Sequence, residues 1–178
     1  MRLDHFALRV PDRHAAAELY VNVFGYRIVD AFDPFEDGKT NCIVLVPPEK
    51  LTHGPVAWML HVDAPDFDSN AEYHLPPEIF ISDGPPGTIV GDWVAERRGI
   101  GGVHHMAYQV DSVEEMMLEA KEKGWFGFSS AEPMRCPGLI QVFTKPLAFA
   151  GGMVLEFIER EGNGVCRANV RRLMESTK

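Results

Sequence analysis

Two short segments in which apolar and polar residues alternate lie 100 positions apart in the chain. They are LDHFALRV (3–10) and VHHMAYQV (103–110), and aligning them superimposes His5 on His105. A two-residue period is typical of a β-strand that packs one face against a core. Both segments are therefore predicted to be strands, and the chain is predicted to repeat one structural unit.

The same order of elements follows each of these predicted strands. A helical pattern extends over 12–24 and ends at Gly25, and a second one extends over 112–123 and ends at Gly124. Glycine adopts the left-handed conformation that commonly terminates a helix. Because the helices recur at nearly the same offset as the strands, they strengthen the evidence for a repeat.

Further strands are predicted after each helix, from short runs of β-branched and aromatic residues. They fall at 26–32, 40–46, 126–130, 139–145 and 153–159, and either 55–62 or 77–82 supplies the fourth strand of the first half. Each half is thus predicted to be a βαβββ module. The expected fold class is α+β, with two tandem modules forming one curved mixed sheet around a metal site, and a C-terminal helix.

The whole chain, 1–178, is expected to form one domain. Its predicted parts are a first module with an insertion (1–84), a linker (85–102), a second module (103–160) and a C-terminal helix (161–178). The insertion is placed where Asp and Pro are frequent, because these residues favour loops.

Strand alternation also predicts which side chains share a face. His5 and Arg9 lie on one face of the first strand, and the opposite, apolar face is expected to pack on the helix. The histidine face is then concave in both modules, so His5, His105 and Glu156 can line one cavity. A carboxylate within an apolar run is costly to bury without a partner. These three residues are therefore predicted to bind a metal, whereas His104 is predicted to point away from His105.

The composition of the chain argues against several classes of binding partner. The net charge of −9 argues against binding to nucleic acid or to an anionic membrane, and no apolar run is long enough to span a bilayer. The first residues lack the pattern of a signal peptide. Cys42, Cys136 and Cys166 are odd in number and widely spaced, so neither a disulfide framework nor a thiolate zinc site is expected. A reducing, cytoplasmic location is the expectation that follows.

The segments GGVHHMAYQV and LIQVFTKPLAFAGGMVLEFIER resemble the vicinal-oxygen-chelate superfamily. Within it, the chain is similar over nearly all its length to the catalytic C-terminal half of 4-hydroxyphenylpyruvate dioxygenase, most specifically at 138–160. This resemblance implies that His5, His105 and Glu156 hold iron(II), with positions left open for substrate and O₂. Another divalent metal remains an alternative.

The resemblance also assigns residues to the substrate pocket. It implies catalytic roles for Gln141, Phe143 and His104, and substrate contacts for Gln141, Phe143, Ser82, Val154 and Val170. The last three replace an Asn and two aromatic residues of the family, so the metal site is kept while the pocket is rewritten. A different substrate from 4-hydroxyphenylpyruvate is therefore expected.

Three roles remain open between two interpretations each. Arg9 either binds a substrate carboxylate or forms an ordinary salt bridge at the strand end. His104 either orients a neighbouring ligand or is structural. His61 is either a fourth metal ligand or a histidine at a strand end.

The expected function is an Fe(II)-dependent dioxygenase that oxidises a 2-oxo acid, or a related chelating small molecule, with O₂. One alternative is a non-redox divalent-metal isomerase, epimerase or lyase of the same superfamily. The other is a metal-free small-molecule binding protein. The expected partners are a small-molecule substrate and O₂, with a homodimer as one option for assembly, and neither nucleic acid nor a membrane.

Overall fold

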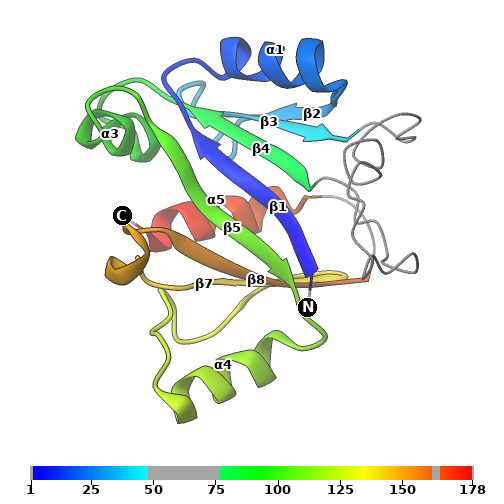
Figure 1. Ribbon diagram of the computed structural model, residues 1–178, viewed down its shortest axis with the longest axis vertical. Coiled ribbons are helices and arrows are strands. Elements are labelled where there is room, and N and C mark those ends of the chain that lie inside the picture. The colour runs from blue at the N-terminus through cyan, green and yellow to red at the C-terminus, as the bar shows by residue number, and fades with distance from the viewer. Residues whose placement is uncertain (1, 48–76, 162–164, 178) are drawn as a thin grey trace, which may run out of the picture.

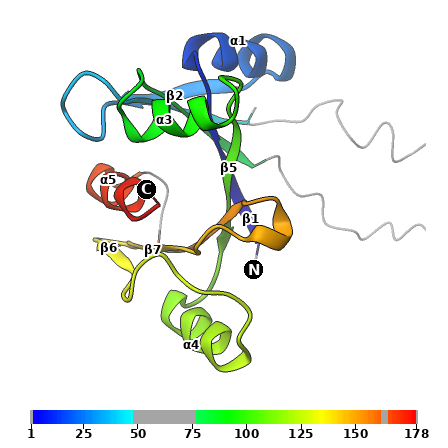
Figure 2. The same cartoon turned by 90° about the vertical axis from the view of Figure 1, so that its left-hand side faces the viewer.

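A computed structural model describes residues 2–47, 77–161 and 165–177. Its strands form one eight-stranded mixed sheet in the order β2-β3-β4-β1-β5-β8-β7-β6. The sheet curls so that α5 lies on its concave side, while α1 and α4 lie outside (Figures 1 and 2). The strands are β1 (Arg2–Arg9), β2 (Arg27–Phe32), β3 (Asn41–Val46), β4 (Glu78–Asp83), β5 (Gly102–Gln109), β6 (Met134–Cys136), β7 (Leu139–Phe143) and β8 (Val154–Arg160).

The sheet repeats itself about its centre, as the sequence predicts. In the first half β1 pairs in parallel with β4, and in the second half β5 pairs in parallel with β8. The remaining pairs within each half are antiparallel. An antiparallel pairing of β1 with β5 joins the halves, so the two strands with the histidines lie side by side at the middle of the sheet.

The two predicted outer helices are confirmed, with caps that explain their ends. Asp12 accepts hydrogen bonds from backbone amides at the start of α1 (Arg13–Phe24), and Ser112 does the same for α4 (Val113–Lys123). Gly25 and Gly124 end them in the left-handed conformation. Each helix packs on the convex face of its own module.

One predicted strand is wrong. Residues 126–130 form only an isolated bridge between Phe128 and Thr144, and β6 follows them as the edge of the sheet. Two backbone hydrogen bonds flank this bridge, from Ser129 N to Phe143 O at 2.8 Å and from Lys145 N to Gly127 O at 2.9 Å. The ring of Phe126 also stacks on that of Phe157 at 5.8 Å, so the segment lies against the sheet, but its backbone pairing does not extend into a strand.

Of the two segments proposed as the fourth strand of the first half, 77–82 is observed as a strand. It forms β4, which lies between β3 and β1 in the sheet. The alternative at 55–62 lies outside the described residues. The segment 85–102 connects the two halves and contains α3 (Ile89–Glu96), which Thr88 caps. Val90 and Val94 of this helix pack in the concave core. The C-terminal helix is α5 (Arg167–Ser176).

The expectation of no disulfide framework needs a correction, because the structure contains one disulfide. A disulfide joins Cys136 at the end of β6 to Cys166 at the start of α5, while Cys42 is free and buried. The sequence separation of 30 residues gives no sign that the fold brings these ends together. The cysteine pattern therefore carries no argument for a reducing compartment. Within the described residues, no helix has both the length and the apolar character that a bilayer span requires.

Candidate metal centre

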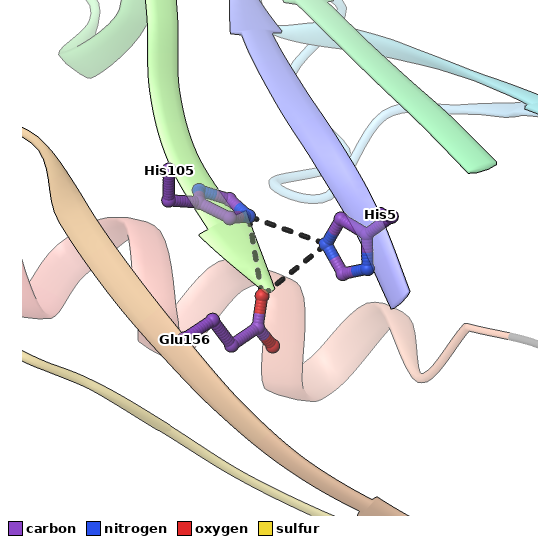
Figure 3. Close-up of side chains that lie close together, drawn as sticks. All are labelled: His5, His105 and Glu156. Carbon is purple, nitrogen blue, oxygen red and sulfur yellow. Dashed lines mark hydrogen bonds and ion pairs between the residues drawn. The ribbon is translucent and has the colours of Figure 1, made fainter. Parts of the chain in front are cut away.

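The three predicted ligands meet on the concave face of adjacent strands. His5 comes from β1, His105 from β5 and Glu156 from β8 (Figure 3). The two imidazole Nε2 atoms are 3.3 Å apart, and Glu156 Oε2 lies 3.2 Å from that of His5 and 3.1 Å from that of His105. These residues are called the His-His-Glu cluster below.

The spacing within this cluster fits a divalent cation. Nitrogen and oxygen ligands bind such ions at about 2.0–2.2 Å, so ligands at right angles are roughly 3 Å apart. The three measured separations are 3.1–3.3 Å. Three ligands on one side of an ion leave the other side open for a substrate. Among the described residues, this is the group of histidine, cysteine and carboxylate side chains placed to hold a metal.

Two β-bulges shape the cluster. In the pairing of β1 with β5, Leu3 and His5 oppose successive residues, so Asp4 is an extra residue in β1. Correspondingly, His105 and Val103 oppose successive residues of β1, so His104 is an extra residue in β5. Asp4 and His104 occupy equivalent positions in the repeat, each immediately before a histidine of the cluster.

The bulged residues hold the outer nitrogens of both imidazoles. Asp4 Oδ1 lies 2.8 Å from His5 Nδ1 and also accepts a hydrogen bond of 2.9 Å from Arg160. His104 Nδ1 lies 2.8 Å from His105 Nδ1. A partner on the outer nitrogen fixes the orientation of a metal-binding imidazole and its tautomer. The prediction that His104 points away from His105 is wrong, because the bulge breaks the strict alternation of the strand.

Two side-chain amides, hydrogen-bonded in series, connect Glu156 to the C-terminal helix. Its side chain is buried, and Gln141 Nε2 of β7 donates a hydrogen bond of 2.6 Å to Glu156 Oε1. Asn169 Nδ2 of α5 donates in turn to Gln141 Oε1 at 3.1 Å. This leaves Oε2 directed at the two imidazoles. Gln141 thus contacts the predicted carboxylate ligand, a role that differs from direct contact with a substrate.

The protonation of the cluster is asymmetric. Burial disfavours a charged His5, but its hydrogen bonds with Asp4 and Glu156 outweigh burial and raise the pKa of His5 to about 9. Burial dominates for His105 and lowers its pKa. Burial alone would raise the pKa of Glu156, yet the hydrogen bonds from His105 and His5 hold it well below its usual range. Without a metal, the cluster therefore keeps an imidazolium at His5 beside a carboxylate.

A pocket extends from the cluster, and the structure places most of the predicted substrate residues in it. Its lining includes Arg9, Ser82, Gln141, Phe143 and Val170. The Phe143 ring lies 4.6 Å from the His105 ring and forms one wall. The exception is Val154, which is buried in a cluster with Phe143 rather than exposed to the pocket.

Sequence analysis missed Glu78, which also lines this pocket. The parallel pairing of β1 with β4 places Glu78 opposite His5, and burial raises the pKa of its carboxyl group while Arg160 opposes this effect. The sequence did contain a sign of this role: Glu78 in PEIFIS (77–82) lies four positions before Ser82, so both side chains point to the same face of a strand. It went unused because the choice between the two candidate strands was undecided. His61, the other candidate fourth ligand, lies outside the described residues.

A family model and a curated protein both match this chain over most of its length. Residues 4–135 match the family described as the Glyoxalase/Bleomycin resistance protein/Dioxygenase superfamily. The chain is 28% identical over 154 residues, 86% of its length and 94% of the relative, to an ethylmalonyl-CoA/methylmalonyl-CoA epimerase of Cereibacter sphaeroides.

Two solved structures support the fold. A methylmalonyl-CoA epimerase from Mycobacterium tuberculosis has a TM-score of 0.61 at 18% identity, with 90% of this chain and 88% of that chain covered. A Streptomyces coelicolor methylmalonyl-CoA epimerase variant, in complex with 2-nitronate-propionyl-CoA, has a TM-score of 0.62 at 18% identity, covering 93% and 99%.

These findings correct the predicted reaction. The relatives are epimerases, so the predicted Fe(II)-dependent dioxygenase, an oxidoreductase, is wrong. The non-redox isomerase stated as the alternative agrees better with them. The closer likeness to 4-hydroxyphenylpyruvate dioxygenase, and O₂ as a partner, gain no support. The superfamily itself is confirmed, since its model matches well over half of the sequence: the chain belongs to the Glyoxalase/Bleomycin resistance protein/Dioxygenase superfamily.

Proposed function

We propose that this chain is a non-redox epimerase that depends on a divalent metal and acts on an acyl-CoA with an acidic α-carbon, such as a 2-alkylmalonyl-CoA. The observation that supports this proposal most is the His-His-Glu cluster. It occurs in a chain that is 28% identical over 154 residues to an ethylmalonyl-CoA/methylmalonyl-CoA epimerase. A metal-free binding protein has less support. It would have no use for a buried carboxylate facing two imidazoles.

Epimerisation at a carbon next to a carbonyl requires that a C–H proton leave and another return on the opposite face. A divalent ion, when bound, polarises the carbonyl oxygen and makes the neighbouring proton more acidic. His5, His105 and Glu156 would hold that ion, and Asp4 would keep His5 oriented through its 2.8 Å hydrogen bond. No step in such a reaction needs electron transfer, so iron(II) has no special advantage over zinc or cobalt.

The proton-transfer role falls to Glu78 in this proposal. Glu78 and Glu156 are the two carboxylates among the described residues that line the pocket, and Glu156 is committed to the cluster. Burial raises the pKa of Glu78, which makes it a better proton acceptor than an exposed carboxylate. Its position opposite His5 in the β1–β4 register puts it at the edge of the cluster.

The test is solvent exchange at the α-carbon. Protein loaded with Zn(II), Co(II) or Fe(II) is incubated with methylmalonyl-CoA or ethylmalonyl-CoA in D₂O, and loss of the α-proton is followed by NMR. We expect exchange without any requirement for O₂, absent in His105→Ala and retained in His14→Ala, an exposed histidine of α1. No exchange from protein with stoichiometric metal would refute the proposal for these substrates, as would equal exchange in His105→Ala.

Glu78→Gln separates the base from a metal ligand. If Glu78 takes the proton, the exchange rate falls by about 10²–10⁴-fold while metal affinity is kept. If instead metal affinity falls with the rate, Glu78 is a ligand and the base lies elsewhere. Assembly as a homodimer is a separate proposal, which light scattering on the purified chain tests directly.

A further inference from the structure

Arg9 is a buried cation that has no counter-ion among the described residues. Its residue is 2% exposed, and its Nη1 atom is buried without a hydrogen-bond partner in the described part of the chain. No carboxylate of the described residues forms an ion pair with it. Burying a charge without a partner costs several kcal/mol, so arginines in protein interiors are normally paired.

Arg9 has an aromatic ring as a neighbour, which it shares with a second cation. The Arg9 guanidinium lies 5.6 Å from the centre of the Trp93 ring, and Arg97 stacks on the same ring at 3.5 Å. Burial and the charge of Arg97 lower the pKa of Arg9 to about 10, so it stays charged at neutral pH. Burial keeps the nearby His104 neutral, because its pKa is lowered well below the usual range.

Arg9 shares the pocket with the His-His-Glu cluster. His5, Ala7 and Arg9 lie on the same face of β1 and all line the pocket. Four residues of strand separate the His5 and Arg9 backbones by roughly 13 Å, and the small side chain of Ala7 leaves the floor between them open. The pocket has an internal volume of about 50 Å³, which is room for a small polar group such as a carboxylate.

The backbone at Arg9 is fixed by a close contact. Gly101 lies so near that a Cβ atom added to it would be 2.1 Å from the carbonyl oxygen of Arg9. Gly101 also has φ +76, a conformation that other residues rarely adopt. The end of β1 is therefore held in place, and the guanidinium is presented from a rigid strand rather than from a loop.

We infer that Arg9 is the anchor for a carboxylate of the substrate, which its buried Nη1 binds while another oxygen of the same molecule faces the His-His-Glu cluster. This inference rests on the proposed function and deepens it. The pocket then has two different ends, one where Arg160 lies beside the carboxylates of Glu78 and Asp4, close to Glu156, and one with Arg9. A substrate fits when it carries a free acid group beyond the carbonyl that is activated.

A carboxylate fits this end better than a phosphate group. A phosphate carries close to two charges and three acceptor oxygens, and it usually meets several cations and backbone amides. Arg9 is the one charged side chain that the described pocket lining offers at this end. The carboxylate of a substituted malonate has the matching charge and size.

Binding of malonate to metal-loaded protein tests the anchor without measuring turnover. Calorimetry compares malonate with its monoamide, malonamate, in which a neutral amide replaces one carboxylate. We expect the wild-type protein to prefer malonate, and Arg9→Met to lose about 30-fold in malonate affinity but little in malonamate affinity. Arg9→Lys keeps the positive charge but lacks the planar guanidinium group that binds a carboxylate with two hydrogen bonds. It should therefore keep part of the preference for malonate that Arg9→Met loses.

Arg97→Met is the matched control. It removes the same charge beside the same indole, but the Arg97 side chain is 37% exposed and does not line the pocket. We expect its malonate affinity to change less than threefold. Thermal unfolding without ligand adds a second readout: Arg9→Met should raise Tm, because it removes an unpaired buried charge, whereas a structural arginine would lower it.

The outcomes separate this inference from the proposed function. A malonate preference that survives in Arg9→Met overturns the anchor, even if the wild-type protein exchanges α-protons. A preference that is lost in Arg9→Met, partly recovered in Arg9→Lys and kept in Arg97→Met supports the anchor, even if no exchange occurs and the proposed reaction fails. Inorganic phosphate that binds more tightly than malonate, and depends on Arg9, would overturn the assignment to a carboxylate.

Discussion

β1 and β5 carry the same motif and the same distortion but surround their histidines differently. Both strands have a bulge at the residue before the cluster histidine. In β1 that residue is the carboxylate Asp4, and the pKa of His5 is raised to about 9. In β5 it is the imidazole His104, and the pKa of His105 is lowered. The repeat sets the geometry of the cluster, while the charge of each histidine depends on its surroundings: Asp4 raises the pKa of His5, and burial lowers that of His105.

The two strands differ again four residues further on. Arg9 in β1 is buried in the pocket, while its equivalent in β5, Gln109, is half-buried and outside the pocket lining. A symmetric fold thus forms an asymmetric site, with the anion-binding end contributed by the first module. The carboxylate ligand, Glu156, comes from the second module alone.

The largest effect is expected from removing either histidine of the pair. His5→Ala and His105→Ala should each lower affinity for Zn(II) or Co(II) by ~10³-fold or more, because each deletes one of three ligands. Competition with a chelator of known affinity measures this, with His14→Ala as the control. Near wild-type affinity in either alanine variant would show that the metal site lies elsewhere.

The similarity of β1 and β5 is also why the His-His-Glu cluster was predictable from the sequence. Alternation, the 100-residue offset and a carboxylate within an apolar strand identified His5, His105 and Glu156, and the structure brings them together. The orientation of His104 was not predictable. A single bulge reverses the side of the sheet to which a residue points, and that bulge depends on the partner strand.

The reaction was less predictable than the fold, for a chemical reason. Two histidines and a carboxylate serve redox and Lewis-acid metals alike, so the ligand set does not specify the chemistry. The changes at Ser82, Val154 and Val170 were judged against 4-hydroxyphenylpyruvate dioxygenase, a closer likeness that the comparisons do not support, so they did not indicate the reaction. Glu78 was missed because pairing of β4 with β1, which puts it beside His5, is a long-range feature.

A smaller effect is expected at the bulged residues, and it should be unequal. Asp4→Asn should weaken metal binding by about 10–100-fold, because the charge behind His5 is lost. His104→Phe should cost about 10-fold or less, because hydrogen bonds to a neutral partner are weaker than those to a charged one. The same chelator competition applies, with the exposed Asp111→Asn as the charge control. Equal losses would mean that the two bulges have equivalent roles.

The pH dependence of metal binding should follow His5. Its pKa of about 9 in the metal-free protein means that a metal must displace a proton at lower pH. Apparent affinity should therefore rise about tenfold per pH unit up to pH ~9 and then level off. Asp4→Asn should move this break to lower pH. Affinity that is flat between pH 6.5 and 9 would contradict an imidazolium at His5.

Stability without metal should show the opposite trend over the same range. Because the pKa of His5 is raised from 6.5 to about 9 on folding, its contribution is fully present below pH ~6.5 and is lost as the pH rises through 9. Metal-free protein should thus lose stability across this window, while the stability of metal-saturated protein should stay nearly constant, because the rising metal affinity offsets the loss. Thermal unfolding of both forms at several pH values checks that the two stabilities diverge.

The smallest effect on metal affinity is expected from a substitution that weakens the hydrogen bonds behind Glu156. This arrangement has no equivalent in the first module. Asn169→Leu removes the 3.1 Å hydrogen bond to Gln141 and should weaken metal binding by about 3–10-fold, because Gln141 then holds Glu156 less firmly. Stability should change by less than about 1 kcal/mol, since the same substitution removes the buried Oδ1 of Asn169, which lacks a hydrogen-bond partner among the described residues.

The control for this variant is Asn22→Leu on the exposed face of α1, for which neither quantity should change. If Asn169→Leu unfolds the protein without weakening metal binding, α5 merely covers the sheet. If it weakens metal binding at unchanged stability, α5 takes part in positioning Glu156. The asymmetry between the modules then extends from the bulged residues to the C-terminal helix. The histidines are held from within their own strands, whereas the carboxylate is held by Gln141 of β7, which a helix outside the repeat supports in turn.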